Sequence, residues 1–288
     1  MINVLHIGLS YRCNMHCKHC FVSKQKDLID TNQIKKIIDN LYDKGLVNII
    51  YTYGEPLLAK NINEITSYAN QKGLSQTLMT NGFFLNSKSI DMLIKNNVKN
   101  IMISLDSIDK DKHNENRGLQ DAYDKAIAAV KLLPKNIFNV GFAVSIDDSN
   151  IDELESIVEL AKELNIKKIS FLTKRINGKL VEFNNIKKLE DFLEKSLSCD
   201  IRIVFHDYRL IKKIKELYQS KKIDLNQYER FVSMNSCHQN YTLSIAPNGD
   251  VFSCNLINNK IGNIIEEELD YILEKRNEKK CINCYSKF

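Results

Sequence analysis

The sequence has no run of apolar residues long enough to cross a membrane and no recognisable secretion signal. None of its 288 residues lies in a stretch approaching the roughly 20 consecutive apolar residues that a membrane-spanning helix needs. The first ten residues, MINVLHIGLS, lack the charged start and the small-residue cleavage site of a signal peptide. These absences predict a cytoplasmic protein without a membrane partner.

A basic arm is absent as well. The 41 Lys and Arg residues and the 36 Asp and Glu residues are spread along the chain, so the net charge of +5 is not gathered in one place. Nucleic-acid-binding proteins concentrate positive charge on a patch or an arm. We therefore interpret the charge as a solvated surface and expect no nucleic-acid partner.

Cysteine, in contrast, is plentiful. The chain has eight cysteines, and the cytoplasm keeps thiols reduced, so metal binding or catalysis explains them better than disulfides do. With 43% hydrophobic residues the chain can bury a sizeable core, which fits one large α/β domain with or without a small appendage.

Short β-branched runs alternate with helical periods over the first 173 residues, a pattern typical of βα units with parallel strands. We expect strands at Val4 to Leu9, Val47 to Tyr53, Ser75 to Thr80, Lys99 to Leu105, Asn139 to Ser145 and Lys167 to Leu172. The helices expected between them are Thr31 to Lys44, Ile62 to Lys72, Ser87 to Asn96, Asp121 to Leu132 and Ile151 to Leu164. Six such units cannot close an eight-stranded barrel, so the sequence predicts a partial (β/α)6 TIM-like barrel with its active site at the carboxyl ends of the strands.

The pattern changes after this region. We expect helices at Ile186 to Ser196 and Asp207 to Gln219, with a strand at Asp200 to Phe205 between them. Pro247-Asn248-Gly249 then predicts a β-hairpin, and a final helix follows. The expected domains are the barrel core at 1–180, a connecting segment at 181–230, and a small C-terminal hairpin-plus-helix domain at 231–288.

Cys13, Cys17 and Cys20 follow the first expected strand. Four thiolates normally hold a cubane [4Fe-4S] cluster, so a tight loop with only three leaves one iron open to another ligand. Zinc is the alternative, because His16 or His19 could supply a fourth tetrahedral ligand.

The spacing Cys-x3-Cys-x2-Cys after the first strand resembles the radical S-adenosylmethionine superfamily, and the resemblance covers about residues 3–173. It implies a [4Fe-4S] cluster whose open iron binds S-adenosylmethionine, with reductive cleavage to a 5'-deoxyadenosyl radical. Tyr53-Gly54-Glu55-Pro56 is similar to the family's Gly-Gly-Glu-Pro motif, which binds the methionyl amino group. Tyr53 replaces the first glycine, and the resemblance assigns Gly54, Glu55 and Pro56 to the cofactor.

Further cofactor contacts are implied at the ends of later strands. Each has an ordinary alternative: a turn for Asn81, a loop cap for Asp106, a surface position for Arg117, and a buried strand for Val144. The resemblance assigns Ser104 and Asp106 to the ribose and nearby methionyl groups and Arg117 to the methionyl carboxylate. The remaining implied contacts with the cofactor are Asn81 and, near adenine, His19 and Val144.

A second group of cysteines lies near the C-terminus. Its members are Cys237, Cys254, Cys281 and Cys284. They resemble the auxiliary-cluster domains of this superfamily, and four ligands fit the short Twitch form of the longer SPASM domain, with one protein-ligated auxiliary [4Fe-4S] cluster. A zinc ribbon is the alternative. Cys199 is left over, either as a hydrogen-atom donor to a substrate radical or as a small buried hydrophobe, and we favour the second.

The resemblance implies a radical enzyme with an external one-electron donor such as flavodoxin or ferredoxin. We expect it to abstract hydrogen from a ribosomal peptide or a natural-product precursor, followed by oxidation, crosslinking or epimerisation. Only 12 residues precede Cys13, so the leader-binding domain of many peptide-modifying relatives is not expected. A dehydrogenase of a sugar or small molecule is the main alternative, and a non-catalytic zinc or iron-sulfur redox sensor is the remote one.

Overall fold

A curved sheet of ten strands forms the centre of the computed structural model, which describes residues 2–20, 22, 25–176, 179–206, 208–231, 241–254 and 259–278. The strand order is β12-β11-β10-β1-β2-β3-β4-β5-β6-β9. Neighbouring strands are parallel from β10 to β9, and the two pairs β10–β11 and β11–β12 are antiparallel. Among the described strands, β12 and β9 at the two ends of the sheet do not pair with each other, so the barrel is open.

The elements follow the expected βα alternation. The strands of the sheet are β1 (Val4–Gly8), β2 (Asn48–Thr52), β3 (Ser75–Thr80), β4 (Asn100–Ser104), β5 (Asn139–Ile146), β6 (Lys168–Thr173), β9 (Arg202–Phe205), β10 (Thr242–Ile245), β11 (Asp250–Phe252) and β12 (Lys260–Asn263). A separate hairpin consists of β7 (Arg175–Ile176) and β8 (Lys179–Leu180). The helices are α1 (Thr31–Asp43), α2 (Ile62–Gln71), α3 (Ser87–Lys95), α4 (Lys110–Arg117), α5 (Ala122–Leu132), α6 (Leu154–Glu163), α7 (Ile186–Ser196), α8 (Tyr208–Gln219), α9 (Leu225–Phe231) and α10 (Leu269–Glu278), with short 3-10 turns at Pro56–Leu58 and Ile151–Glu153.

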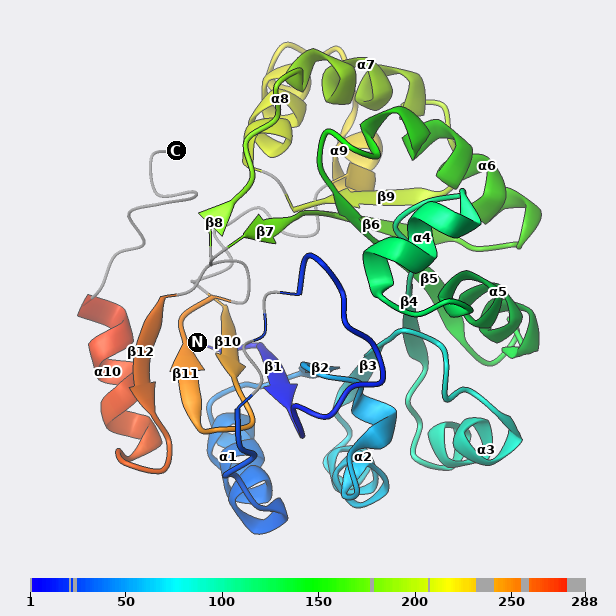
Figure 1. Cartoon of the computed structure of the whole chain (residues 1–288). Coiled ribbons are helices and arrows are strands. Elements are labelled where there is room, and N and C mark those ends of the chain that lie inside the picture. The colour runs from blue at the N-terminus through cyan, green and yellow to red at the C-terminus, as the bar shows by residue number, and fades with distance from the viewer. Residues whose placement is uncertain are drawn as a thin grey trace.

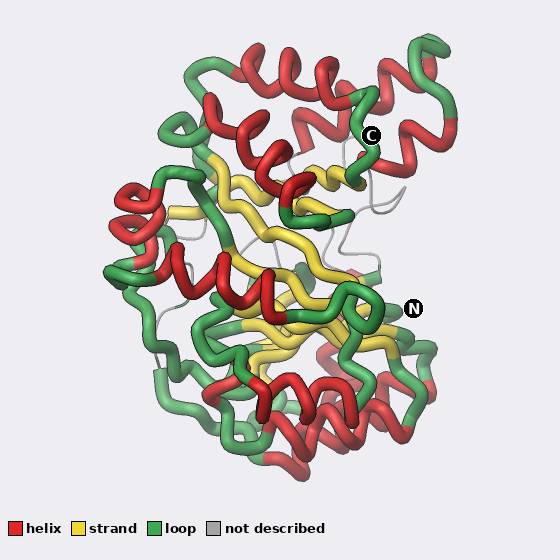
Figure 2. Tube along the Cα trace, turned by 90° about the vertical axis from the view of Figure 1, so that its right-hand side faces the viewer, coloured by secondary structure: helices red, strands yellow, loops and turns green. Residues whose placement is uncertain are grey.

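The helices lie outside the curved sheet. Figure 1 shows α1, α2, α3, α5, α6 and α7 following its outer face, while the dark blue loop after β1 passes across the open centre in this view. In the perpendicular view of Figure 2 the strands form an inner layer with helices around them. The expected partial barrel is therefore confirmed.

The first helix shows how the sequence produces this layer. Asp30 accepts the backbone N–H of Gln33, and the Gln33 side chain accepts the N–H of Asp30, which closes a capping box at the start of α1. Its apolar residues recur every three or four positions, so one face of the helix is buried against the sheet. Full burial of each such side chain contributes roughly 1.5–3 kcal/mol. This buried face consists of Ile34, Ile37, Ile38 and Leu41.

Residues on each strand alternate between the helical layer and the barrel interior. On β6, Ile169 and Phe171 are fully buried in the core, whereas Ser170 and Leu172 line an interior cavity. Closed barrels of this type fill their interior with bulky branched residues. Here many inward positions carry Ser, Thr, His, Lys or Arg, and a cavity of about 520 Å³ remains.

Two elements differ from the expectation. β9, expected as a strand in the connecting segment, pairs in parallel with β6 and adds a strand to the barrel sheet beyond the six expected. Helix α4 was not foreseen because its sequence, KDKHNENR, has no apolar periodicity. Asp109 caps its start and Gly118, in the left-handed conformation with φ 62°, ends it. Among the residues that the structure describes, no helix is long and apolar enough to span a membrane.

Candidate active site

The loop after β1, here called the cysteine loop (residues 9–20), is held by hydrogen bonds at both ends. Near its start, the Tyr11 N–H donates to Asp27 Oδ1 at 2.7 Å. Near its end, the His16 N–H donates to the carbonyl of Arg117 at 3.1 Å, and the Lys18 N–H donates to that of Asn116 at 2.9 Å. The C-terminal end of α4 therefore supports the loop that carries the three cysteines.

Two glycines allow close contact of backbone with this loop. A Cβ atom at Gly54 would lie 2.5 Å from the Arg12 carbonyl oxygen, and one at Gly118 would lie 2.5 Å from that of His16. Both glycines also have positive φ, 48° and 62°. Any side chain at either position would displace the loop, which explains why glycine is needed in both motifs.

The three thiols of the loop are free. Burial raises the pKa of Cys13 and of Cys17, and the Arg117 guanidinium opposes this effect at Cys17. Among the residues with described positions, no three Cys, His, Asp or Glu side chains converge to hold a single ion. A cubane cluster offers a separate iron to each thiolate, so three thiols on one loop are the donors that a three-cysteine cluster needs.

Glu55 lies beside this loop as a buried carboxylate, 1% exposed. It accepts hydrogen bonds from Thr80 Oγ1 and the Asn81 N–H, both at 2.8 Å, and from the Leu57 N–H at 3.2 Å. No described Lys, Arg or His forms an ion pair with it, and burial raises its pKa to about 7. A carboxylate that lines the cavity without a cation is suited to an ammonium group, such as that of the methionyl moiety.

Asn81 connects three parts of the site. Its backbone N–H donates to Glu55, its side-chain Nδ2 donates to Asn14 of the cysteine loop at 2.9 Å, and its side-chain Oδ1 accepts from the Phe83 N–H at 2.9 Å. The Thr80-Asn81-Gly82 turn is thus both a turn and a part of the site wall.

Asp106 and Arg117 form a buried ion pair. The Arg117 Nε lies 2.7 Å from Asp106 Oδ2, and Nη2 donates to Oδ1 at 2.8 Å. Although burial opposes ionisation, Arg117, His19 and His113 hold the pKa of Asp106 at about 2. Asp106 is fully buried and is not among the cavity-lining residues, whereas Arg117 and Ser104 are. The carboxylate of Asp106 therefore orients Arg117, while the assigned cofactor roles of Ser104, Asp106 and Arg117 stay predictions.

His19 lines the same part of the cavity. Its Nε2 lies 3.5 Å from Asp106 Oδ2. Burial, with Arg117 and Lys174 acting in the same direction, lowers its pKa to about 4. The imidazole is therefore neutral at pH 7, which suits contact with an uncharged aromatic ring such as adenine.

Three other assigned residues lie away from the cavity. Val144 points into the core, and its neighbours Ala143 and Ser145 line the cavity instead, because successive residues of a strand face opposite sides. Pro56 is buried at the start of a 3-10 turn. Cys199 belongs to the hydrophobic core, where its Sγ accepts from the Ile201 N–H at 3.4 Å. This placement favours a packing role for Cys199.

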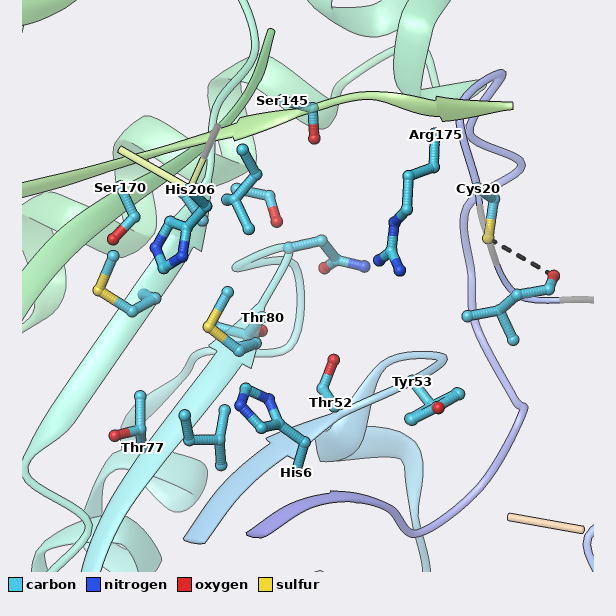
Figure 3. A pocket seen from close by; sticks show the side chains of 18 of the residues that line it. His6, Cys20, Thr52, Tyr53, Thr77, Thr80, Ser145, Ser170, Arg175 and His206 are labelled. Carbon is cyan, nitrogen blue, oxygen red and sulfur yellow. Dashed lines mark hydrogen bonds between the residues drawn. The ribbon is translucent and has the colours of Figure 1, made fainter. Parts of the chain in front are cut away.

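The cavity is also lined by residues that the motifs did not indicate. Figure 3 shows His6, Thr77, Ser170 and His206 directed into it from several strand segments, and Arg175 reaching in from the side of Cys20. The alternation of polar and apolar residues along the strands was the sequence signal for these residues. That alternation alone could not show which face of each strand lines the barrel interior.

The C-terminal cysteines are described only in part. Cys254 follows β11 and is buried, while Cys237, Cys281 and Cys284 lie outside the described residues. Burial lowers the pKa of Arg175, and Tyr53, Cys254 and Cys20 act in the opposite direction. The guanidinium of Arg175 thus lies within electrostatic reach of both the cysteine loop and the end of the hairpin.

Known proteins resemble this chain along most of its length. The chain is 26% identical over 272 residues to the antilisterial bacteriocin subtilosin biosynthesis protein AlbA of Bacillus subtilis, which covers 92% of this chain and 58% of AlbA. It is 28% identical over 169 residues to the Fe-coproporphyrin III synthase of Methanosarcina barkeri, covering 57% of this chain and 42% of that protein. The chain therefore spans about half the length of these relatives.

Solved structures share the fold. Streptococcus suis SuiB bound to S-adenosylmethionine superimposes with a TM-score of 0.73 at 16% identity, covering 95% of this chain and 65% of SuiB. Native anSMEcpe with bound AdoMet and Cp18Cys peptide gives 0.70 at 19% identity, covering 96% and 82%. The sequence model of the radical SAM superfamily matches residues 7–161, more than half of the chain. With the three-cysteine loop, the Gly54-Glu55 turn and the open parallel barrel in place, the chain belongs to the radical S-adenosylmethionine superfamily.

Proposed function

We propose that this radical SAM enzyme modifies a peptide. The observation that carries the proposal is a cavity of about 520 Å³ that extends from the three cysteines through the barrel, in a chain of which 92% aligns with a bacteriocin biosynthesis protein. The solved structures of similar fold include SuiB bound to the precursor peptide SuiA and anSMEcpe bound to peptides. These likenesses support a peptide substrate over a sugar.

The residues of the chain divide the work at the cofactor end. Cys13, Cys17 and Cys20 would hold the cluster, and Glu55 would receive the methionyl ammonium group. When bound and reduced by an external donor such as flavodoxin or ferredoxin, the cluster and S-adenosylmethionine supply a 5'-deoxyadenosyl radical that takes a hydrogen atom from the substrate. The buried turn of Gly54 keeps the cysteine loop close to Glu55.

An auxiliary [4Fe-4S] cluster is part of the proposal. Its ligands would be Cys237, Cys254, Cys281 and Cys284. Full ligation by protein leaves no iron open to substrate, so such a cluster is suited to electron transfer, for example accepting one electron from a substrate radical during oxidation. Arg175 lines the cavity and interacts electrostatically with both Cys20 and Cys254, which supports a position of the auxiliary cluster near the cavity.

Deuterium transfer tests the peptide proposal. The anaerobically reconstituted enzyme would be incubated with S-adenosylmethionine, dithionite and uniformly deuterated peptides encoded next to its gene. Deuterium in the released 5'-deoxyadenosine, absent with Cys17→Ser, is the expected result. Transfer from a deuterated sugar and from none of the peptides would contradict the proposal.

A further inference from the structure

The cavity continues past the cofactor end to the opposite end of the barrel. Lys168 and Arg202 line it there, as the first residues of β6 and β9. These strands are parallel, and the two residues are direct partners in the sheet register. The cysteine loop follows the carboxyl end of β1, whereas Lys168 and Arg202 lie where strands begin, so the two features lie at opposite ends.

Neither of these basic side chains has a partner in the described part of the chain. Among the described residues, none forms a hydrogen bond or an ion pair with the side chain of Lys168 or of Arg202. Both residues are exposed to solvent at this end of the cavity. Surrounding protein nevertheless lowers the pKa of Lys168, first through desolvation and second through the charge of Arg202.

The neighbouring residues in the sheet do not balance these two positive charges. Met102 and Gly141 lie in the same register row and are uncharged. Glu55 is the one carboxylate among the described residues that line the cavity, and it lies at the other end beside Thr80. Like charges placed as cross-strand neighbours are destabilising, so this pair does not serve the stability of the sheet.

We propose that Lys168 and Arg202 form an anion subsite, called here the basic subsite, that binds a carboxylate of the peptide substrate. The inference rests on the proposed function and names a recognition element of that substrate. The planar fork of Arg202 matches a carboxylate with two parallel hydrogen bonds, and the Lys168 ammonium adds a second charge.

The length of the barrel determines how far the bound carboxylate of the substrate lies from the cofactor end. The six residues of β6 span about 15–20 Å at roughly 3.3 Å per residue. Allowing for the reach of both basic side chains, the bound carboxylate lies about 10–20 Å from the cofactor end, or three to six residues of extended chain. A peptide with an acidic side chain or its C-terminus at that spacing fits this cavity, whereas a single sugar does not reach both ends.

Competitive acylation of Lys168 tests the basic subsite without requiring the natural substrate. The holoenzyme would be treated with a limiting amount of an acetylating ester, and acetylation of Lys168 and of the adjacent Lys167 would be measured by mass spectrometry. Lys167 is exposed and does not line the cavity, so it serves as the internal reference. The probes are N-acetyl-trialanine with a free carboxylate, the same peptide as its C-terminal amide, and inorganic phosphate.

The free carboxylate should slow acetylation of Lys168 relative to Lys167, by about tenfold at ten times its Kd, and the amide should not. Arg202→Gln, which keeps both lysines and removes the guanidinium, should abolish this protection.

Three outcomes would overturn the proposal: no protection by the acid, equal protection by the amide, or stronger protection by phosphate than by the acid. The acetylation experiment and the deuterium-transfer experiment fail independently. If the proposed function is wrong, no deuterium is transferred from peptides, yet protection of Lys168 by the free carboxylate can still be measured.

Discussion

Two buried carboxylates of the site have opposite protonation properties. Glu55 has hydrogen-bond donors but no described cation, and burial raises its pKa to about 7. Asp106 is equally buried, yet Arg117 and two histidines hold its pKa at about 2. The different neighbours make Asp106 a permanent anion that fixes Arg117, and leave Glu55 able to gain or lose a proton near neutral pH.

The raised pKa of Glu55 predicts a pH dependence of stability. Between its ordinary pKa of 4.5 and about 7, the folded state binds a proton that the unfolded chain has released. The free energy of unfolding should therefore fall as pH rises through this range, by at most about 3 kcal/mol. Glu55→Gln should remove this slope. Urea unfolding of both proteins at pH 5 and pH 8, in the same metal state, measures the difference, and parallel profiles would refute it.

The Asp106–Arg117 pair predicts a large loss of stability when one partner is neutralised. Asp106→Asn leaves the Arg117 guanidinium buried without its anion. We expect the free energy of unfolding to fall by about 3–5 kcal/mol, measured by urea denaturation at pH 7. The exposed pair of Lys18 and Glu115 provides the matched control, because Glu115→Gln should change stability little. Equal effects of the two substitutions would show that burial does not determine the cost.

At the scale of elements, the turn after β2 carries an unusual pair of backbone conformations. Tyr53 has φ 61° and Gly54 has φ 48°, so two successive residues are left-handed. Glycine adopts this conformation without strain, which accounts for the two glycines of the Gly-Gly-Glu-Pro motif. Tyr53, which stands in place of the first glycine, is therefore strained. The Tyr53 hydroxyl lies 3.1 Å from Ser244 Oγ, and its ring packs edge-on against Tyr11, which offsets the strain.

This turn predicts an inverted order of stability for small substitutions. Tyr53→Ala loses the ring contacts and keeps the left-handed strain, whereas Tyr53→Gly loses the same contacts and relieves the strain. Tyr53→Gly should therefore be more stable than Tyr53→Ala by about 1 kcal/mol in chemical denaturation. At Thr52, the last residue of β2, the usual order with alanine about 0.5–1 kcal/mol more stable should hold. The usual order at both positions would argue against strain at Tyr53.

At the scale of the whole molecule, the sheet joins the two ends of the chain. β10 pairs in parallel with β1 over Val4 to Ile7, so the C-terminal hairpin is continuous with the barrel. The segment after this hairpin begins at Cys254, near the cavity wall that carries Arg175. A cluster bound there would lie beside the reaction cavity without being part of the cofactor site.

If the chain holds two clusters, removing a ligand of either one should halve the iron content of the protein. The reconstituted wild type should bind about eight irons, and Cys17→Ser and Cys254→Ser should each bind about four. Cys254→Ser should still release 5'-deoxyadenosine without substrate turnover, and Cys17→Ser should release none. Iron and zinc analysis with chromatographic detection of 5'-deoxyadenosine measures these outcomes. Zinc in place of iron in the Cys17→Ser variant would contradict an auxiliary iron-sulfur cluster.

Local sequence was enough to predict several parts of this protein. The βα alternation predicted the strands from β1 to β6 because hydrophobic period and turn residues act over short distances. The cysteine spacing and the Gly54-Glu55-Pro56 motif indicated the superfamily, which the family comparison confirmed. Charged α4, in contrast, was missed, because caps at Asp109 and Gly118 and packing define it rather than an apolar stripe.

Only the tertiary structure decided the arrangement inside the barrel. Alternation along β6 is visible in the sequence, but the curvature of the sheet determines that Ser170 and Lys168 face inward while Ile169 and Phe171 meet the helices. Val144 was assigned to the cofactor by its position along the chain, and the same alternation turned it toward the core. Sequence therefore determined which chemistry the chain carries. The long-range pairing of strands determined which side chains share the cavity, because contact between residues far apart in the sequence depends on how the strands pair in three dimensions.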